Sequence, residues 1–206
     1  WHMQLELREF RKQDYKKTIR FAITGMHFDW YMDSRVLLNL YGRYFWYLEL
    51  TRATHVLAAY CGDALAGVLL AEIKGGQPCC RSWGMRLYVR VFDVLQRLFA
   101  PGGAGVYEAA NRALFEAYRR THTPDGEVLF LAAAPAARGT GVGSLLLAEL
   151  ARRAPGKEVY LYTDDACTYQ FYEKRGFHRE GERCITVEFG GRKTPLRCFL
   201  YSRVLG

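Results

Sequence analysis

A glycine-rich segment between two apolar stretches is the part of this 206-residue sequence whose residue types point most directly to chemistry. It reads Arg138-Gly139-Thr140-Gly141-Val142-Gly143-Ser144. Leucines recur at helical spacing after it, which predicts a helix that begins near Gly141. The first amides of a helix have no partners within it and attract anions, and glycine lets a phosphate approach them closely. The segment therefore predicts a pyrophosphate cradle with Arg138 as an added cation. An ordinary strand-to-helix turn is the alternative.

Regular elements on both sides would hold this cradle in place. The apolar run over 127–133 predicts a buried strand that leads into the glycines. Beyond the cradle helix, residues 158–163 predict a second strand. A short helix then starts at Asp165 or Thr168 and ends at Gly176. The middle of the chain is therefore one strand–helix–strand unit.

The remaining elements follow from periodicity and from capping residues. In chain order we predict a strand over 4–10, a helix over 15–23 capped by Asp14, a loop over 27–33, a helix from Ser34 to about Leu48, strands over 55–60 and 65–73, and closing strands over 180–189 and 196–204 joined by Gly190-Gly191. Both ends favour antiparallel pairing. We expect an α/β (α+β) fold, with a mixed, mostly antiparallel sheet flanked by helices and a single domain over 3–206.

Residues 74–125 are predicted to be a helical insertion, because glycine and proline clusters open, divide and close the segment. One helix over 83–99 gathers leucines and aromatic residues together, with its arginines outside that cluster. A second helix is predicted over 106–120. We expect a basic amphipathic helix of this kind to pack against its own domain; lying on a membrane, binding a partner and closing over a site are the alternatives.

The composition is that of a globular domain, with 50% hydrophobic and 24% charged residues. No apolar run approaches membrane-spanning length, no signal-peptide pattern is found, and the six cysteines show no metal-ligand spacing. We therefore expect a reduced, cytoplasmic protein without a metal.

The net charge of +8 favours an anionic partner such as nucleic acid, a membrane surface or a phosphorylated cofactor. Acids interleave with the N-terminal basic residues, so nucleic acid is not expected.

Two motifs resemble the GNAT superfamily of N-acetyltransferases. Residues 138–143 match its pyrophosphate signature, Arg/Gln-x-x-Gly-x-Gly/Ala, and the run Phe171-Tyr172-Glu173-Lys174-Arg175-Gly176-Phe177 is similar to its helix-ending Tyr-Glu-Lys-x-Gly-Phe. The predicted order of elements also follows the family's plan, except over 74–125. The resemblance implies the GNAT fold, acetyl-CoA as cofactor with CoA as product, and transfer of an acetyl group to a primary amine of a small molecule or peptide.

The same resemblance implies which residues bind the cofactor. In the family, the backbone of the strand before the cradle pairs with the pantetheine arm, a role that falls here on Leu131, Ala132 and Ala133. The pyrophosphate would be bound by Arg138, Gly139, Thr140, Gly141, Val142, Gly143 and Ser144. Where many members carry a cofactor-contacting asparagine, this chain has Asp165. Asp165 either takes that contact or only caps the following helix.

Catalytic roles are implied at two positions. Glu127 stands where some histone-type members carry a glutamate base, which would remove a proton from the acceptor's ammonium group. A solvated strand end is its alternative role, and Glu72, Asp164, Asp165 or a water relay could replace it. Tyr172 stands where the family has a proton donor to the departing thiolate, although a half-buried core tyrosine is also compatible with the sequence.

The acceptor site is implied near the first two helices, whose loop carries Phe28, Asp29, Trp30 and Tyr31. Aromatic faces beside carboxylates suit a cationic or aromatic amine. The same aromatics could instead pack under the sheet or against a second subunit, so a homodimer stays open. We expect the 74–125 insertion to form a lid or wall over the acceptor site.

Two other functions could use a glycine-rich cradle of this kind. A dinucleotide-binding protein is disfavoured because Ser144 takes the place of a third glycine and no further strand–helix repeats follow. A GNAT-like protein that binds CoA or a partner without catalysis is compatible with the same fold.

Overall fold

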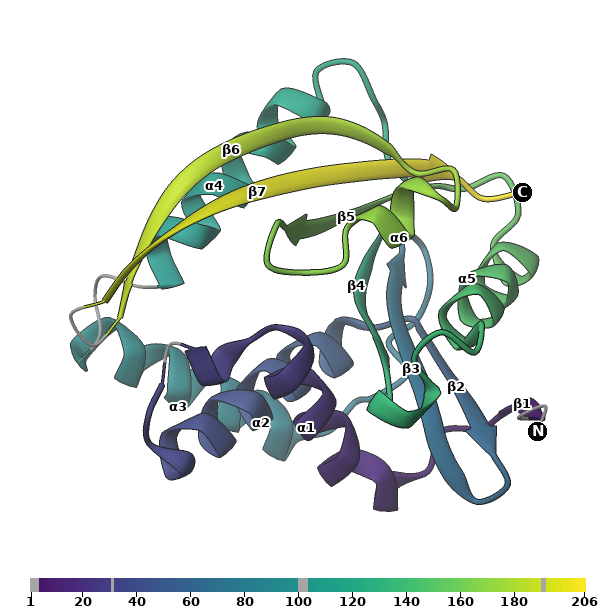
Figure 1. Cartoon of the computed structure of the whole chain (residues 1–206), viewed down its shortest axis with the longest axis horizontal. Coiled ribbons are helices and arrows are strands. Elements are labelled where there is room, and N and C mark those ends of the chain that lie inside the picture. Colours follow the sequence, from purple (N-terminus) through teal and green to yellow (C-terminus); the bar gives the residue numbers. More distant parts are fainter. Residues whose placement is uncertain (1–3, 31, 100–103, 190–191) are drawn as a thin grey trace.

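Strands from both halves of the chain form one sheet, flanked by helices (Figure 1). The computed structural model describes residues 4–30, 32–99, 104–189 and 192–206. Across the sheet the described strands are β1 (Leu5–Arg8), β2 (His55–Cys61), β3 (Ala64–Ile73), β4 (Gly126–Ala133), β5 (Glu158–Asp164), β7 (Arg192–Val204) and β6 (His178–Phe189). The helices are α1 (Tyr15–Gly25), α2 (Arg35–Arg52), α3 (Trp83–Phe99), α4 (Ala104–Tyr118), α5 (Val142–Arg153) and α6 (Gln170–Glu173).

The predicted mixed, mostly antiparallel sheet is confirmed. Strands β4 and β5 are its parallel pair, and the other described neighbours run antiparallel. The parallel pairing is short, because the register joins Gly126 to Val159 and Glu127 to Tyr160 and then ends. Beyond this point the two strands diverge (Figure 1). The sheet therefore consists of two halves that are joined at the base of a split.

A β-bulge reshapes β4 within this split. Leu70 of β3 lies opposite Phe130, but Ala71 lies opposite Val128, so Leu129 is the extra residue. Val128 packs with the core cluster under α5, whereas Phe130 packs with the cluster under α1 and α2. A bulge bends a strand and re-aims its side chains. Because of this bulge, Val128 and Phe130 point to opposite faces of the sheet although they are two residues apart.

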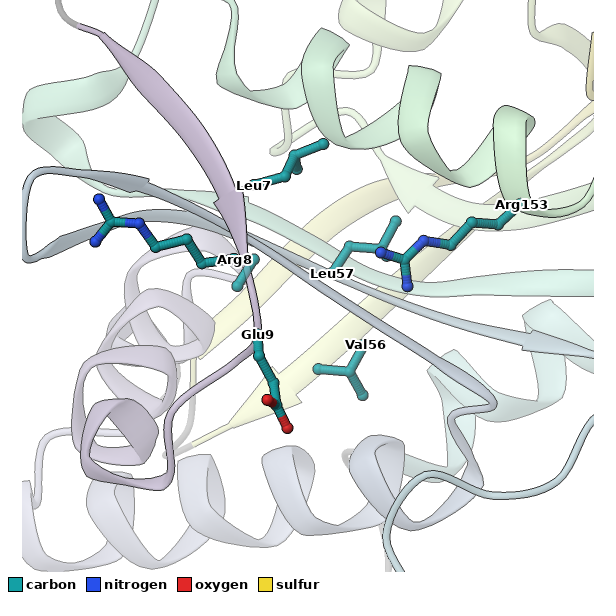
Figure 2. A pocket seen from close by; sticks show the side chains of 7 residues that line it. Leu7, Arg8, Glu9, Val56, Leu57 and Arg153 are labelled. Atoms are coloured by element: carbon teal, nitrogen blue, oxygen red, sulfur yellow. The ribbon is translucent and has the colours of Figure 1, made fainter.

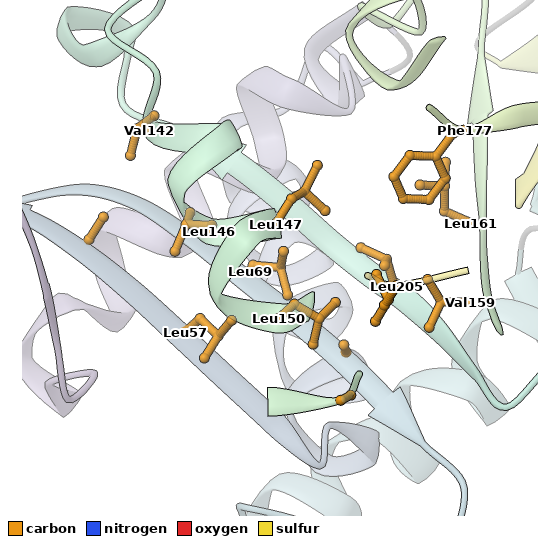
Figure 3. Close-up of a cluster of buried hydrophobic side chains, with 14 of the residues drawn as sticks. Leu57, Leu69, Val142, Leu146, Leu147, Leu150, Val159, Leu161, Phe177 and Leu205 are labelled. Carbon is orange, nitrogen blue, oxygen red and sulfur yellow. The ribbon is translucent and has the colours of Figure 1, made fainter. Parts of the chain in front are cut away.

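Helix α5 covers one face of the sheet and fixes the position of the cradle. Leu146 and Leu150 on its inner side are fully buried. Figure 3 shows these leucines over the central strands, and the buried residues around them include Leu57, Leu69, Val159, Leu161, Phe177 and Leu205. Because the periodicity after the glycines matches this buried stripe, the predicted cradle helix is confirmed.

Helices α1 and α2 cover the opposite face, where Trp46 is fully buried and packs near Phe130. Ser34 caps α2 as predicted, accepting a hydrogen bond from the Leu37 amide at 3.4 Å. Asp14 precedes α1 but its side chain does not cap it. The Asp14 carboxylate is buried instead and accepts a hydrogen bond from the Tyr60 hydroxyl at 2.9 Å, so the predicted side-chain cap is wrong.

The two predicted helices within 74–125 are present and pack in different places. Helix α3 packs against α2, while α4 lies along β6 and β7. The hydroxyl of Tyr107 on α4 donates to Asp164 at 3.2 Å, and that of Tyr118 donates to Glu158 at 2.8 Å. Both bonds tie α4 to β5, so this helix is part of the support of the split.

Several predicted boundaries differ from the structure. The first strand ends at Arg8, because Phe10 turns away to stack on Tyr15. The last helix begins at Gln170 and spans one turn, so neither Asp165 nor Thr168 starts it. The closing strands begin earlier than predicted, at His178 and Arg192. The turn at Gly190-Gly191 lies outside the described residues.

In the described residues, none of the helices combines the length and the apolar character that crossing a membrane requires. The six cysteines, all within the described ranges, carry free thiols.

Candidate active site

The cradle is built as a loop of left-handed glycines that leads into α5. Gly139 has φ of 79° and Gly141 has φ of 88°, a conformation that residues with a Cβ rarely adopt. The Leu145 amide donates to the Gly141 carbonyl at 3.0 Å, so the amides of residues 142–144 belong to the unsatisfied first turn of the helix. The Thr140 amide is bonded to the Ala137 carbonyl at 3.3 Å. Arg138 is exposed beside them. The loop therefore offers amide donors and a cation to an anion.

The first turn of α5 is held by the segment that contains α6. A Cβ on Gly143 would lie 2.7 Å from the Phe171 ring, so this glycine is needed for close packing. The Arg175 guanidinium lies 3.9 Å from the centre of the same ring and donates to the Ser144 hydroxyl at 2.8 Å. The Ser144 side chain is thereby committed to Arg175. Its backbone amide remains part of the cradle.

The open side of β4 begins just past Glu127. Leu131, Ala132 and Ala133 pair with β3 on one side, and the pairing with β5 has ended before them. In an antiparallel ladder the peptide groups of alternate residues point away from the partner strand. The Ala134 amide donates to the Ala66 carbonyl of β3 at 2.8 Å, so by this alternation Ala132 also faces β3. Leu131 and Ala133 therefore present backbone donors and acceptors toward the split, in line with the cradle.

Glu127 lies at the base of the split in a cluster of charged side chains. Its carboxylate accepts from Arg52 at 2.8 Å and from the Tyr160 hydroxyl at 3.2 Å. Arg52 also bonds Glu72 at 2.9 Å and Glu49 at 3.4 Å. The Glu127 side chain is only 14% exposed, so the alternative of a solvated strand end is wrong.

Burial sets the protonation of these carboxyls. It raises the pKa of Glu127, while Arg52 and the Tyr160 hydroxyl pull that pKa back down. Burial also raises the pKa of Glu49 to about 8, against the opposing effect of Arg52. Glu49 is therefore largely protonated at neutral pH. Glu127 is thus a buried carboxylate that two hydrogen bonds hold in position. Its pKa is raised toward neutral pH, which suits a general base.

Tyr172 lies on α6 with its ring at the edge of the α5 core. It makes edge-on contacts with Phe171 and Phe177, with ring centres 5.2 Å and 5.6 Å away. Burial and the neighbouring Cys167 raise the pKa of its hydroxyl, which keeps the hydroxyl protonated. Tyr172 is thus half-buried and in the form that a proton donor needs.

Asp165 is engaged by β7. Its carboxylate accepts from the amide of Arg197 at 2.9 Å and from the Arg197 guanidinium at 3.2 Å. Asp164 folds the loop instead, because its carboxylate accepts from the amides of Ala166 and Cys167. The expected alternative of Asp165 as a helix cap is therefore wrong, since α6 begins further along the chain.

The predicted acceptor residues are spread over different environments. Phe28 is a core residue, with its ring 4.8 Å from that of Tyr41 and 5.5 Å from that of Phe45. Packing under the sheet, the alternative for these aromatics, is thus what the structure shows for Phe28. Asp29 is exposed. Trp30 lies in a short 3-10 turn with Asp29, and Tyr31 lies outside the described residues.

A shallow pocket lies away from this site. It is lined by residues of β1, β2 and the end of α5 (Figure 2): Leu7, Arg8, Glu9, Val56, Leu57, Ala58 and Arg153. None of the predicted cofactor-binding or catalytic residues is among them.

The family model described as the acetyltransferase (GNAT) domain matches residues 102–179, which include Glu127, the cradle and Tyr172. No curated protein is significantly similar in sequence. Among solved structures, the chain is similar to a histone acetyltransferase HPA2 and related acetyltransferase from Corynebacterium glutamicum, with a TM-score of 0.56, 18% identity and 96% of each chain covered.

Two further similar structures cover nearly the whole chain. One is the PaiA N-acetyltransferase from Thermoplasma acidophilum in complex with coenzyme A, with a TM-score of 0.52, 16% identity, and 98% of this chain and 99% of that one covered. The other is an N-acetyltransferase from Staphylococcus aureus Mu50, with a TM-score of 0.53, 15% identity and the same coverage. The resemblance to the GNAT superfamily is confirmed. The mixed sheet and its flanking helices match the fold of GNAT acetyltransferase structures.

Three residues to which the sequence assigned no role take part in this candidate site: Arg52, Tyr160 and Arg175. Arg52 and Tyr160 hold Glu127, and Arg175 ties α6 to the cradle. A register between β4 and β5 would have pointed to Tyr160, since it lies opposite Glu127. Nothing in the local pattern around Arg52 indicates a partner in β4.

Proposed function

We propose that this protein is an N-acetyltransferase that moves an acetyl group from acetyl-CoA to a primary amine. The observation that carries the proposal is the split between β4 and β5, which has an anion-binding cradle at one end and the buried carboxylate of Glu127 at the other. A thioester donor bound along β4 would have its phosphates at the cradle and its acyl end toward the split. GNAT acetyltransferase similarity supports this orientation.

The residues at the cradle fit CoA. The left-handed glycines leave open space where a Cβ would stand, and the unsatisfied amides of the first helical turn lie beside the exposed Arg138. These groups would hold the pyrophosphate, and the outward peptide groups of Leu131 and Ala133 would pair with the pantetheine amides. When bound, acetyl-CoA supplies an activated acetyl group. The protein's own residues orient it and handle the protons.

Glu127 is proposed as the base. Its carboxylate takes a proton from the acceptor's ammonium group, directly or through water, so that the nitrogen lone pair can attack the acetyl carbonyl. Arg52 and Tyr160 fix the carboxylate in place. Tyr172 is proposed as the acid that returns a proton to the departing sulfur, and its raised pKa keeps that proton available. The carbon–sulfur bond breaks as the carbon–nitrogen bond forms. The second proton of the nitrogen then passes through water to the Tyr172 oxygen, which restores its hydroxyl, and Glu127 releases its proton to solvent.

The acceptor is proposed to be a cationic or aromatic amine. The side chains of Glu72 and Glu127 carry negative charge at the split and are only partly balanced by Arg52. Asp29 adds an exposed carboxylate near the end of α1, and its role together with Trp30 and Tyr31 stays a prediction. Helix α4 is tied to β5 through Tyr107. This contact supports our proposal that the 74–125 insertion forms a wall of the acceptor site.

The first test is a thermal melt with acetyl-CoA, CoA, NAD or buffer. Ligand at about a hundred times its Kd adds about 2.7 kcal/mol, which raises the midpoint by several degrees for a domain of this size. We expect a shift with both CoA species and none with NAD. A Gly141→Ala variant should lose the shift, because Gly141 has positive φ at the cradle.

Gly62→Ala is the matched control, because Gly62 also has positive φ but lies in the β2–β3 turn. Its midpoint should fall while the CoA shift remains. Acetylation of an amine panel then tests catalysis. A CoA shift without transfer to any amine would support the non-catalytic reading, and a shift with NAD alone would overturn the CoA assignment.

A further inference from the structure

Helix α3 presents a continuous apolar stripe to the outside of the molecule. Its members are spaced along one side of the helix and are all exposed: Trp83, Leu87, Val91, Val94, Leu95 and Leu98. Trp83 is 76% exposed and Leu98 is 68% exposed, so the stripe is open at both ends. At about 100° per residue these positions fall within an arc of roughly 120°. We call these six residues the α3 stripe.

The packing of α3 against its own domain does not use this stripe. A different side of the helix contacts α2, where Phe92 stacks on Tyr44 with ring centres 4.6 Å apart and Tyr88 meets Tyr47 edge-on at 5.4 Å. Val89 on this side is buried. The expectation that α3 packs against its own domain is thus met by one side of the helix alone. The exposed stripe takes no part in the packing of α3 against α2.

A row of arginines borders the stripe. Arg86, Arg90 and Arg97 are exposed and form no ion pair with any residue that the structure describes. At helical spacing they fall on one edge of the stripe, next to Trp83. Asp93 is the one acidic residue of α3, and it accepts a hydrogen bond from the Tyr44 hydroxyl at 2.6 Å. The outer side of α3 is therefore apolar and cationic.

The start of α2 extends this surface. The Tyr88 hydroxyl donates to the Leu40 carbonyl at 3.0 Å, which brings this part of α2 beside α3 (Figure 1). Val36, Leu37 and Leu40 are exposed there. Arg43 lies on the same helix and is also exposed. Two neighbouring helices thus share one exposed face of similar chemistry.

We propose that the α3 stripe and its arginines dock the protein on an anionic lipid surface. An exposed helix face that combines a Trp, several aliphatic side chains and a flanking row of cations matches the boundary between headgroups and acyl chains. The aliphatic residues enter that boundary, and the arginines pair with lipid phosphates. A purely apolar partner would cover the stripe but leave the arginines uncompensated. This proposal does not depend on acetyl transfer.

Vesicle flotation tests the proposal with the 206-residue chain. Vesicles of phosphatidylcholine alone are compared with vesicles of equal parts phosphatidylcholine and phosphatidylglycerol. We expect flotation with the anionic vesicles and little with the neutral ones. Each arginine near the surface contributes about fivefold to binding, so Arg86→Gln/Arg90→Gln/Arg97→Gln should weaken it by roughly 100-fold. High salt should weaken it as well.

A second variant removes the apolar part. Trp83→Gln/Val91→Gln/Leu98→Gln should abolish flotation while the thermal midpoint stays near that of the parent, since these side chains are exposed. The charge control is Arg119→Gln/Arg120→Gln/Lys157→Gln, which removes the same charge from exposed positions off α3. This control should still float.

Three results would overturn the proposal. Equal flotation of the charge control and the Arg86 triple variant would show that only net charge matters. Absence of flotation at low salt would exclude a lipid surface. A stable dimer by light scattering that the Trp83 triple variant converts to monomer, with no vesicle binding by either form, would identify the stripe as a subunit interface instead.

Discussion

Arg52 is the residue around which the chemistry of the split is organised. It comes from the last turn of α2, yet its guanidinium reaches carboxylates on β3 and β4. A single cation beside the buried carboxyls of Glu49 and Glu127 and the partly exposed carboxyl of Glu72 cannot neutralise all of them, and Glu49 responds by holding its proton. The result is one carboxylate, Glu127, that is buried, ionisable and held from two sides.

Replacing Glu127 by Gln is expected to lower kcat by about 100-fold to 10,000-fold, the usual contribution of a positioned base. The amide keeps the shape but cannot accept the proton. In the parent, kcat/KM should rise with pH through the raised pKa of Glu127 and then level off. Glu72→Gln is the control, because it removes a carboxylate from the same Arg52 while leaving Glu127 in place. A larger loss in Glu72→Gln would move the base to Glu72.

Glu49 is expected to make stability fall as pH rises. Its folded pKa of about 8 lies above the ordinary value of 4.5, so the folded state binds the extra proton between these values. Its stabilising contribution is full below about pH 4.5 and is lost on approaching pH 8, by at most about 1.4 kcal/mol per pH unit. Urea unfolding from pH 5 to 8 measures this slope. Glu49→Gln should flatten it, and an unchanged slope would contradict the assignment.

At the scale of elements, α5 and α6 depend on each other through one close contact. Gly143 on α5 has no room for a Cβ because of the Phe171 ring, and that ring is covered by Arg175. Gly143→Ala should therefore push α6 away and weaken CoA binding by about tenfold, measured by titration calorimetry. Gly143→Ala/Phe171→Leu should recover much of the loss. Gly105→Ala on α4 has open space around it and should leave binding unchanged.

The sequence predicts best those elements whose structure depends on residues close together in the chain. The glycines before α5, the leucines within it and Ser34 before α2 each determine their structure locally. Phe28 illustrates the opposite case, because its burial depends on Tyr41 and Phe45 from another helix. Residues such as Arg52 and Tyr160 acquire their place in the site from the register of β4 against its neighbours. That register depends on the bulge at Leu129, which no local pattern indicates.

At the scale of the whole molecule, the two halves of the sheet are joined by few backbone contacts. The β4–β5 register is limited to two residue pairs, while β7 and β6 form a long hairpin on one side and β2 and β3 pair on the other. Helix α4 bonds to β5 and packs along β6 and β7, so it supports that half of the sheet. A ligand that lies in the split would bridge the halves and reduce local opening there.

Hydrogen exchange with and without CoA should show this bridging. We expect slower exchange over 128–134 and 139–144, because the outward amides of β4 and the first amides of α5 would gain acceptors from the ligand. Helix α3 should exchange at the same rate with and without CoA, since it packs on α2 rather than on β4 or β5. Gly141→Ala should remove the protection at both segments together. Protection confined to α3, or to the pocket beside Arg153 in Figure 2, would place CoA elsewhere and separate the split from the cofactor.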